Sequence, residues 1–286
     1  MNCYFETIII MGTGQFAFNC AKYLRELSHL DYVYEYGSYA QSRLEILCNK
    51  MGISYKQLLD KTECDNLMYE IERSNKKTLI VSASNIYIFP KFIIENDHVK
   101  IINYHPALLT KHRGRNAEAW AIYEQDKVTG VTWHEVTSEI DRGAILAERK
   151  IELDSNITSV KLMLKQYQAG FELFKNFVGQ IIEKKDIPTK TTTDYGKMHY
   201  SYEKPNDGIL DLTWKRDKIS AFLRSMDYGS LNVMGSPFIF SEGGRKCCWD
   251  TYKILNSIDG LEATPSIKII NKENMFFVLE NYREVV

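Results

Sequence analysis

The sequence predicts an α/β protein with a smaller β-rich domain at its C-terminal end. Three observations support this prediction. Short apolar runs rich in β-branched residues alternate with helical periodicities through the first half of the chain. A glycine-containing turn follows the first of these runs. Beyond residue 186 the helical pattern gives way to a Pro- and Thr-containing stretch, and short strands follow it.

Composition narrows the class of protein. The chain has 286 residues, 44% of them hydrophobic and 26% charged, which is enough for a large core. A net charge of -1 argues against a nucleic-acid partner, which would favour a basic excess. With no long apolar run and no signal pattern at the N-terminus, we expect a soluble, cytoplasmic protein with no membrane partner. The six scattered cysteines are expected to be reduced thiols.

The first 36 residues predict the opening of a Rossmann-like unit. A strand over residues 7–11 is followed by the turn Gly12-Thr-Gly14, a helix to about residue 27 and a strand over residues 32–36. The turn also imitates a dinucleotide fingerprint, with Glu35 placed where a ribose-binding carboxylate would lie. Two glycines equally allow a tight turn against a sheet. A nicotinamide-dependent enzyme and a non-catalytic nucleotide-binding protein therefore both remain open.

The remaining elements complete two domains. Helices are expected over residues 38–51, 65–74, 158–181 and 215–226, with a strand over residues 78–82 and a hairpin over residues 266–270 and 275–280. The long apolar stripe of the helix over residues 158–181 is most simply a core face, although a homodimer seam stays open. The expected division is residues 1–185 for the first domain and residues 186–286 for the linker and the β-rich domain.

The densest polar chemistry lies in residues 101–146. Strands are expected over residues 99–104, 131–136 and 144–151, and Asn116 is a candidate cap for a helix running to about residue 125. Asn103 and His105 close the first of these strands, and Asp141 follows the second. In open α/β sheets ligands bind at the carboxyl ends of strands. We therefore expect these three side chains to meet there.

Their chemistry suits acyl transfer to an amine. Such an amine must lose a proton, and an imidazole titrates close to neutral pH. The attacked carbonyl becomes an oxyanion, which an amide N–H can stabilise. A carboxylate can orient the imidazole and stabilise its charged form. Asn103, His105 and Asp141 supply one group of each kind.

The same residues also allow other interpretations. Singly, a histidine at a strand end is more often a satisfied polar residue, and Asn or Asp more often forms a turn or cap. The set His105, His112, His134 and Asp141 has no zinc-like spacing, so we predict no metal. Because His134 alternates with Trp133 along a strand, it need not face the site.

The run resembles the formyltransferases that use 10-formyltetrahydrofolate. That family combines Asn-x-His, a short Leu-Leu-containing loop, Arg-Gly, and an Asp before Gly-x-Ile-Leu. Here these are Asn103-Tyr-His105, a loop containing Leu109, Arg113-Gly, and Asp141-Arg-Gly-Ala-Ile-Leu. Thr110 departs from the family's usual proline, which concerns the rigidity of the loop. Weaker similarity at residues 207–214 extends the resemblance to the β-rich domain, so that it covers most of the chain.

The resemblance implies a Rossmann-like catalytic domain, with 10-formyltetrahydrofolate as the donor. It implies His105 as base, Asn103 as oxyanion stabiliser and Asp141 as support for His105. The folate contacts that it implies are Ile86, Tyr87, Ile88 and Leu109. For the side chains of residues 86–88, plain core packing is an equal alternative. Arg115 and Asn116 follow the branch acting on nucleotide-linked amino sugars. Residues 130–134 resemble the branch acting on amino acids, so an amino-acid amine or hydroxyornithine remains an alternative acceptor.

Overall fold

The computed structural model describes residues 3–37, 40–231, 233–262 and 264–285. It contains two compact units, each assembled from segments that are separate in the sequence. The first unit comprises Met1–Arg113, Gly130–Ile151 and Gln166–Lys197, and the second comprises Gly114–Thr129, Glu152–Lys165 and Met198–Val286. A single boundary at residue 185 is therefore a simplification of the chain path, and it stays a prediction.

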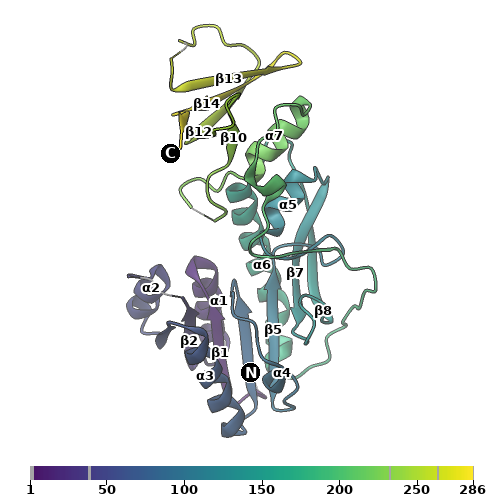
Figure 1. The fold of residues 1–286 in the computed structure, drawn as a ribbon. Helices are drawn as coiled ribbons and strands as arrows, with labels where there is room; N and C mark the ends of the chain where they lie inside the picture. Colours follow the sequence, from purple (N-terminus) through teal and green to yellow (C-terminus); the bar gives the residue numbers. More distant parts are fainter. Residues whose placement is uncertain (1–2, 38–39, 232, 263, 286) are drawn as a thin grey trace. The chain divides into compact units, whose positions relative to one another are not determined.

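A seven-stranded sheet organises the first unit (Figure 1). Its strands are β1 (Thr7–Gly12), β2 (Tyr32–Tyr36), β3 (Tyr55–Leu58), β4 (Thr78–Ala83), β5 (Val99–His105), β7 (Val128–Glu135) and β8 (Ile145–Glu152). They lie in the order β3-β2-β1-β4-β5-β7-β8. The first five are parallel to their neighbours, whereas β7 runs antiparallel to β5. This is the predicted Rossmann-like arrangement with an antiparallel extension.

The order of the strands reverses between β1 and β4, and open sheets of this kind commonly bind ligands at such a reversal. Gly12 ends β1 at this point. A Cβ on Gly12 would overlap the carbonyl oxygen of Ala83 on β4, so only glycine allows the two strands to approach so closely. The glycine turn predicted from the sequence therefore has a packing role.

Helices cover both faces of this sheet. They are α1 (Gly14–Leu27), α2 (Arg43–Met51), α3 (Lys61–Ser74), α4 (Lys91–Ile94) and α6 (Ser159–Ile182). Alternate residues of β1 point to opposite faces. Ile8 and Ile10 join a core that also holds apolar residues of α1, α2 and α6, and Ile9 and Met11 join one built with α3 and α4.

Two helices begin at positions other than those expected. The helix predicted over residues 38–51 begins at Arg43, because the Ser42 hydroxyl accepts hydrogen bonds from the Leu44 and Glu45 amides. Residues 38–39 of that prediction lie outside the described residues. The helix predicted from residue 65 begins earlier, at Lys61, where Asp60 caps it through the Glu63 amide. Both corrections come from cap residues that the apolar periodicity does not register.

The side chains of β5 divide between the two faces of the sheet. Ile102 and Tyr104 enter the core formed with α1, α2 and α6. The Trp133 indole of β7 enters the same core and donates to the Gly170 carbonyl of α6 at 2.9 Å. Since side chains alternate along a strand, Asn103, His105 and His134 project from the opposite face. The core thereby fixes where the polar side chains lie.

The second unit combines helices with short antiparallel strands. Its elements include α5 (Ala117–Tyr123), α7 (Arg216–Ser225), β10 (Phe238–Phe240), β11 (Lys246–Cys248), β12 (Thr251–Leu255), β13 (Ile267–Lys272), β14 (Met275–Glu280) and β15 (Arg283–Glu284). Ile219, Phe222 and Phe277 are fully buried in its core. The predicted hairpin is present as β13 and β14, paired antiparallel around Glu273 and Asn274, which both have positive φ.

The predicted linker is not entirely irregular. It contains β9 (Lys197–His199) and a 3-10 turn over Pro205–Gly208. Among the described residues, no helix has the length and apolar character needed to cross a membrane.

Candidate active site

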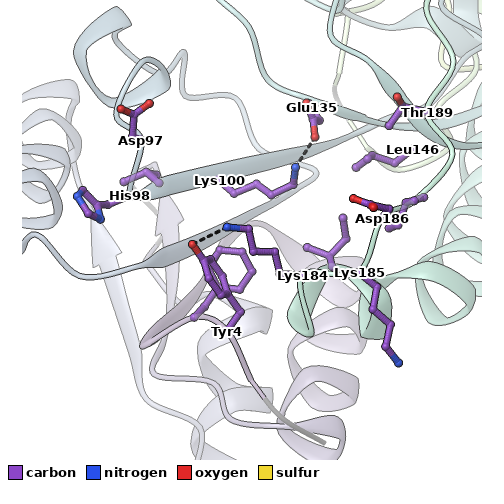
Figure 2. A pocket seen from close by; sticks show the side chains of 14 residues that line it. Tyr4, Asp97, His98, Lys100, Glu135, Leu146, Lys184, Lys185, Asp186 and Thr189 are labelled. Atoms are coloured by element: carbon purple, nitrogen blue, oxygen red, sulfur yellow. Dashed lines mark hydrogen bonds and ion pairs between the residues drawn. The ribbon is translucent and has the colours of Figure 1, made fainter.

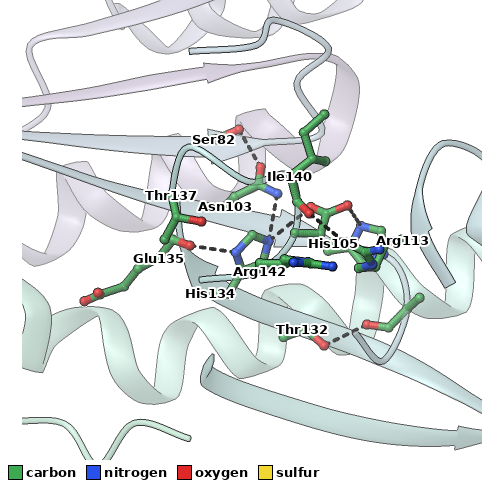
Figure 3. A network of polar contacts seen from close by, with 12 residues as sticks. Ser82, Asn103, His105, Arg113, Thr132, His134, Glu135, Thr137, Ile140 and Arg142 are labelled. Carbon is green, nitrogen blue, oxygen red and sulfur yellow. Dashed lines mark hydrogen bonds and ion pairs between the residues drawn. The ribbon is translucent and has the colours of Figure 1, made fainter. Parts of the chain in front are cut away.

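Asn103 and His105 lie together in the first unit (Figure 3), and the Asp141 carboxylate contacts the His105 ring. Asn103 and His105 stand at the carboxyl end of β5, where Pro106 stops the strand. Asp141 lies in the turn between β7 and β8, with a positive φ of 52°. The side chains of His105 and Asp141 are 3% and 8% exposed, so both act in a largely water-free environment. The short spacing of Asn103 and His105 places both on one face of the strand.

Hydrogen bonding defines the tautomer of His105. Its Nε2 lies 2.7 Å from the carbonyl oxygen of His112 in β6 (His112–Gly114), and a carbonyl can only accept. Nε2 therefore carries the proton, and Nδ1 holds the free lone pair. Nδ1 is 3.5 Å from Asp141 Oδ2. A proton accepted at Nδ1 would thus meet the Asp141 carboxylate directly.

The protonation state of His105 suits a base. Burial lowers the pKa of its imidazole below the usual value, although the Asp141 carboxylate and the His112 carbonyl act in the opposite direction. Desolvation is the largest cause, so the ring is neutral at neutral pH. A neutral imidazole beside a carboxylate can accept a proton and then be stabilised as the cation.

Asn103 is held from both sides. The Ser82 hydroxyl donates to Asn103 Oδ1 at 2.7 Å, and Asn103 Nδ2 lies 3.2 Å from His134 Nε2. An amide nitrogen has two hydrogens, and the contact with His134 uses one of them. The other hydrogen is available to a carbonyl oxygen bound at this end of the sheet.

His134 belongs to this cluster, which the sequence did not lead us to expect. In the antiparallel pairing of β5 with β7, His134 stands directly opposite Asn103. Its Nε2 is also 3.4 Å from Asp141 Oδ1, and its side chain is 3% exposed. Trp133 takes the core face, so the alternation that seemed to leave His134 unconstrained in fact places it in the cluster. The alternation of side chains along β7 was visible in the sequence, but only the pairing of β7 with β5 shows that His134 faces Asn103.

Arg113, part of the Arg-Gly motif, supports the turn that carries Asp141. Its Nε donates to the Gly196 carbonyl at 2.9 Å, and one terminal nitrogen donates to the Ile140 carbonyl at 3.3 Å. Its guanidinium also lies over the Tyr195 ring, 5.5 Å from the centroid. Arg113 therefore holds backbone in place next to Asp141.

The residues predicted to contact folate divide into exposed and buried side chains. Ile86 and Ile88 are 43% and 63% exposed in the loop after β4. The side chains of Tyr87 and Leu109 are buried, and the Tyr87 hydroxyl donates to Asp65 at 2.7 Å. The roles of all four residues remain predictions.

The residues predicted to bind the acceptor, Arg115 and Asn116, lie in the second unit. The Arg115 side chain is exposed, and its backbone amide donates to the His199 carbonyl at 2.9 Å. Asn116 occupies the N-cap position of α5 with a positive φ of 54°, but its side chain makes no capping hydrogen bond. The acceptor role of both residues stays a prediction.

The carboxylate of Glu35 already has partners within the protein. Its side chain is buried and accepts hydrogen bonds from the Ser42 hydroxyl and, at 2.8 Å, from the Tyr55 hydroxyl. These contacts join β2 to β3 and to the start of α2. A ribose would have to displace them, which weighs against the nicotinamide alternative. Among the described residues, no group of three or more His, Cys, Asp or Glu is arranged to hold a metal.

A cavity of about 430 Å³ opens at the other end of β5 (Figure 2). Among its lining residues, Lys100 pairs with Glu135, and Lys184 Nζ donates to the Tyr4 hydroxyl at 2.9 Å. None of the predicted site residues lines this cavity. It is therefore separate from the polar cluster.

Fold and cluster together define a Rossmann-like protein with an Asn–His–Asp site at the carboxyl ends of its strands. Comparison with known proteins identifies the domain more closely. Residues 47–177 match the family model described as formyl transferase. The matched region includes all three predicted catalytic residues.

Related proteins are similar over different shares of the chain. The GDP-perosamine N-formyltransferase of Brucella melitensis is 26% identical over 159 residues, which are 55% of this chain and 60% of that protein. The methionyl-tRNA formyltransferase of Alkaliphilus oremlandii is 28% identical over 252 residues, 85% of this chain and 78% of that protein. The match thus spans about three fifths of the sugar-modifying relative's length.

A solved structure agrees with the fold. The N-formyltransferase from Helicobacter canadensis, in complex with folinic acid and dTDP-3-aminofucose, has a TM-score of 0.67 and 17% identity, and the match covers 97% of this chain and 99% of that one. The predicted fold class is thereby confirmed.

Proposed function

We propose that this protein is an N-formyltransferase. It moves a formyl group from 10-formyltetrahydrofolate to the primary amine of a nucleotide-linked amino-deoxy sugar. The observation that carries the proposal is the cluster of half-buried Asn103 with buried His105 and Asp141, inside the region that matches the formyl transferase model. The cluster offers a base, a carboxylate and an amide donor without a side-chain nucleophile, which fits a substrate that brings its own nitrogen.

Each residue of the cluster has one role in this proposal. His105 Nδ1 takes the proton that the amine loses as its nitrogen bonds to the formyl carbon. Asp141, 3.5 Å away, stabilises the resulting imidazolium. Asn103 donates its second amide hydrogen to the carbonyl oxygen as that oxygen gains negative charge. When the bond to the donor nitrogen breaks, His105 returns the proton to that nitrogen.

The donor-binding part of the proposal involves the loop after β4. When bound, 10-formyltetrahydrofolate supplies the formyl carbonyl that the amine attacks. Ile86 and Ile88 would cover the pterin through their exposed side chains, while Tyr87 would contribute backbone contacts. Leu109, which is buried, would contact the donor from a different loop. A cytoplasmic location belongs to the same proposal.

His105 is expected to titrate below the usual histidine range. Burial lowers its pKa, so an NMR titration of the His105 ring should have its midpoint below about 6.5. In Asp141→Asn the carboxylate that favours the imidazolium is gone, and the midpoint should move to still lower pH. His105→Asn identifies the resonance. A midpoint above 6.5, or an upward move in Asp141→Asn, would contradict the base assignment.

We expect the acceptor to be a nucleotide-linked sugar amine rather than Met-tRNA or a free amino acid. The net charge of -1 does not suit tRNA phosphates, and Arg115 can bind a phosphate or polar sugar group. The named sugar substrate of one relative and the dTDP-sugar in the solved structure point the same way. A competition assay with excess donor should include GDP- and dTDP-linked amino sugars, hydroxyornithine and Met-tRNA.

Arg115→Ala provides the matched variant for that assay. A hydrogen bond to a charged group contributes about 1.5–3 kcal/mol, so KM for the nucleotide sugar should rise roughly tenfold or more. KM for the donor should not change. Arg245→Ala, which removes an exposed arginine elsewhere in the second unit, is the control. Formylation of hydroxyornithine or Met-tRNA with every sugar amine inert would overturn the acceptor assignment and leave the cluster standing.

A further inference from the structure

The amide of Asn103 lies in the middle of a chain of hydrogen bonds that runs from one backbone group to another. The chain passes through Asn85, Ser82, Asn103 and His134, all in the first unit. Its direction matters, because an amide that is turned around presents an oxygen where the reaction needs an N–H. The two backbone ends decide that direction.

The first end is the amide of Tyr87, which can only donate. It donates to Asn85 Oδ1 at 3.1 Å, so the other atom of that carboxamide is Nδ2. Asn85 Nδ2 lies 3.4 Å from Ser82 Oγ and donates to it. The single hydrogen of the Ser82 hydroxyl is then left for Asn103, and the Asn103 atom facing Ser82 must be Oδ1.

The second end is the carbonyl of Glu135, which can only accept. His134 Nδ1 lies 2.8 Å from it and therefore carries a hydrogen. In the neutral ring, Nε2 then has a lone pair, and its Asn103 neighbour at 3.2 Å must be a donor. Both ends thus assign the same orientation to Asn103, with Oδ1 toward Ser82 and Nδ2 toward His134.

We propose that Asn85, Ser82 and His134 are positioning residues, which keep the N–H side of Asn103 directed at the reacting carbonyl oxygen. This inference rests on the proposed function for its effect on turnover. Turning the amide over would set Asn103 Oδ1 against the His134 lone pair. A hydroxyl can donate or accept, so Ser82 by itself would permit both orientations. The selection comes from the two backbone ends.

The chain also joins two parts of the proposed site. Asn85 lies in the loop after β4, next to residues 86–88, which are predicted to contact the donor. Ser84 in the same loop has a positive φ of 60°. Asp141 faces the far end, 3.4 Å from His134 Nε2. The conformation of the loop after β4 therefore affects the orientation of the Asn103 amide, which is the group proposed to stabilise the oxyanion.

Asn85→Asp tests the direction of the chain with an isosteric change. A carboxylate can only accept, so it competes for the Ser82 hydrogen, and Ser82 must then accept from Asn103. We expect kcat to fall at least about tenfold. The upper limit is the roughly 10²- to 10³-fold that full loss of an oxyanion donor costs. Asn85→Ala and Ser82→Ala should cost less, because His134 still selects the orientation. Donor KM should stay within about twofold of wild type.

Asn96→Asp is the matched control, since Asn96 accepts a local hydrogen bond from the His98 amide and has no part in the chain. Thermal unfolding of each variant separates positioning from stability. A second readout needs no substrate: ¹⁵N NMR of the wild-type ring should find the His134 proton on Nδ1 at the assay pH.

Several results would overturn the proposal. One is a wild-type kcat in Asn85→Asp, and another is a His134 proton on Nε2. The third is a larger loss of kcat in Asn85→Ala than in Asn85→Asp, accompanied by a matching loss of thermal stability. If wild-type protein formylated no amine at all, the proposed function would fail instead. The tautomer of His134 would then still decide whether the hydrogen bonds from Tyr87 to Glu135 run in the direction assigned here.

Discussion

Replacing His105 with asparagine should lower kcat by roughly 10²- to 10⁴-fold, the usual contribution of a general base. The imidazole is neutral because burial lowers its pKa, and its Nδ1 lone pair faces Asp141. Asparagine offers no basic nitrogen, and its shorter side chain does not reach the His112 carbonyl as Nε2 does. The loss should therefore appear in the chemical step, measured under single-turnover conditions with donor and acceptor saturating.

The control for this prediction is His98→Asn. His98 is an exposed histidine at the other end of β5, so the same substitution there should leave turnover unchanged. Thermal unfolding of both variants shows that the fold is kept, although His105→Asn should be somewhat less stable because it loses a buried hydrogen bond. Near-normal turnover in a folded His105→Asn protein would remove His105 from the mechanism.

Much of the sheet could be predicted because its strands are buried on both faces. The strands β1 and β4 are largely apolar, and alternate apolar residues of β1, β4 and β5 enter two different cores. The strand β3 was not predicted. Its sequence Tyr-Lys-Gln-Leu buries only Leu58 fully, as suits a strand at the edge of the sheet. A half-polar edge strand carries little periodic signal.

The predicted site residues were found through spacing along the chain, and this explains what was missed. Asn103 and His105 are two residues apart on one strand, so their common direction follows from the sequence. His134 joins them through the pairing of β5 with β7, and that register depends on contacts distant in sequence. Ser82 reaches Asn103 in the same way, across the pairing of β4 with β5. Local patterns carry no information about either pairing.

The division of the chain into units could not be read from local composition for a related reason. The segments Gly114–Thr129 and Glu152–Lys165 belong with the C-terminal residues, although they are separated from them in the sequence. Buried contacts within the second unit, such as the Tyr228 hydroxyl donating to Glu118 at 2.8 Å, join residues far apart in sequence. Only the packing of the folded chain reveals this grouping.

Replacing Asn103 with alanine should slow the chemical step by about 10²- to 10³-fold, the usual cost of removing one oxyanion donor. Ser82 and His134 hold the Asn103 carboxamide on both sides, so its free N–H is directed before the substrate arrives. Such a group acts mainly on the developing charge and contributes little to ground-state binding.

Single-turnover rates and donor affinity should therefore separate in Asn103→Ala, with a slow chemical step and a donor Kd close to wild type. Asn96→Ala supplies the control, because Asn96 lies in a turn before β5 and accepts only a local hydrogen bond. Asn103→Ala also leaves the Ser82 hydroxyl and His134 Nε2 without their partner, so its unfolding temperature should be compared with that of Ser82→Ala. An unchanged chemical step with weakened donor affinity would instead make Asn103 a donor-binding residue and leave the oxyanion without an assigned partner.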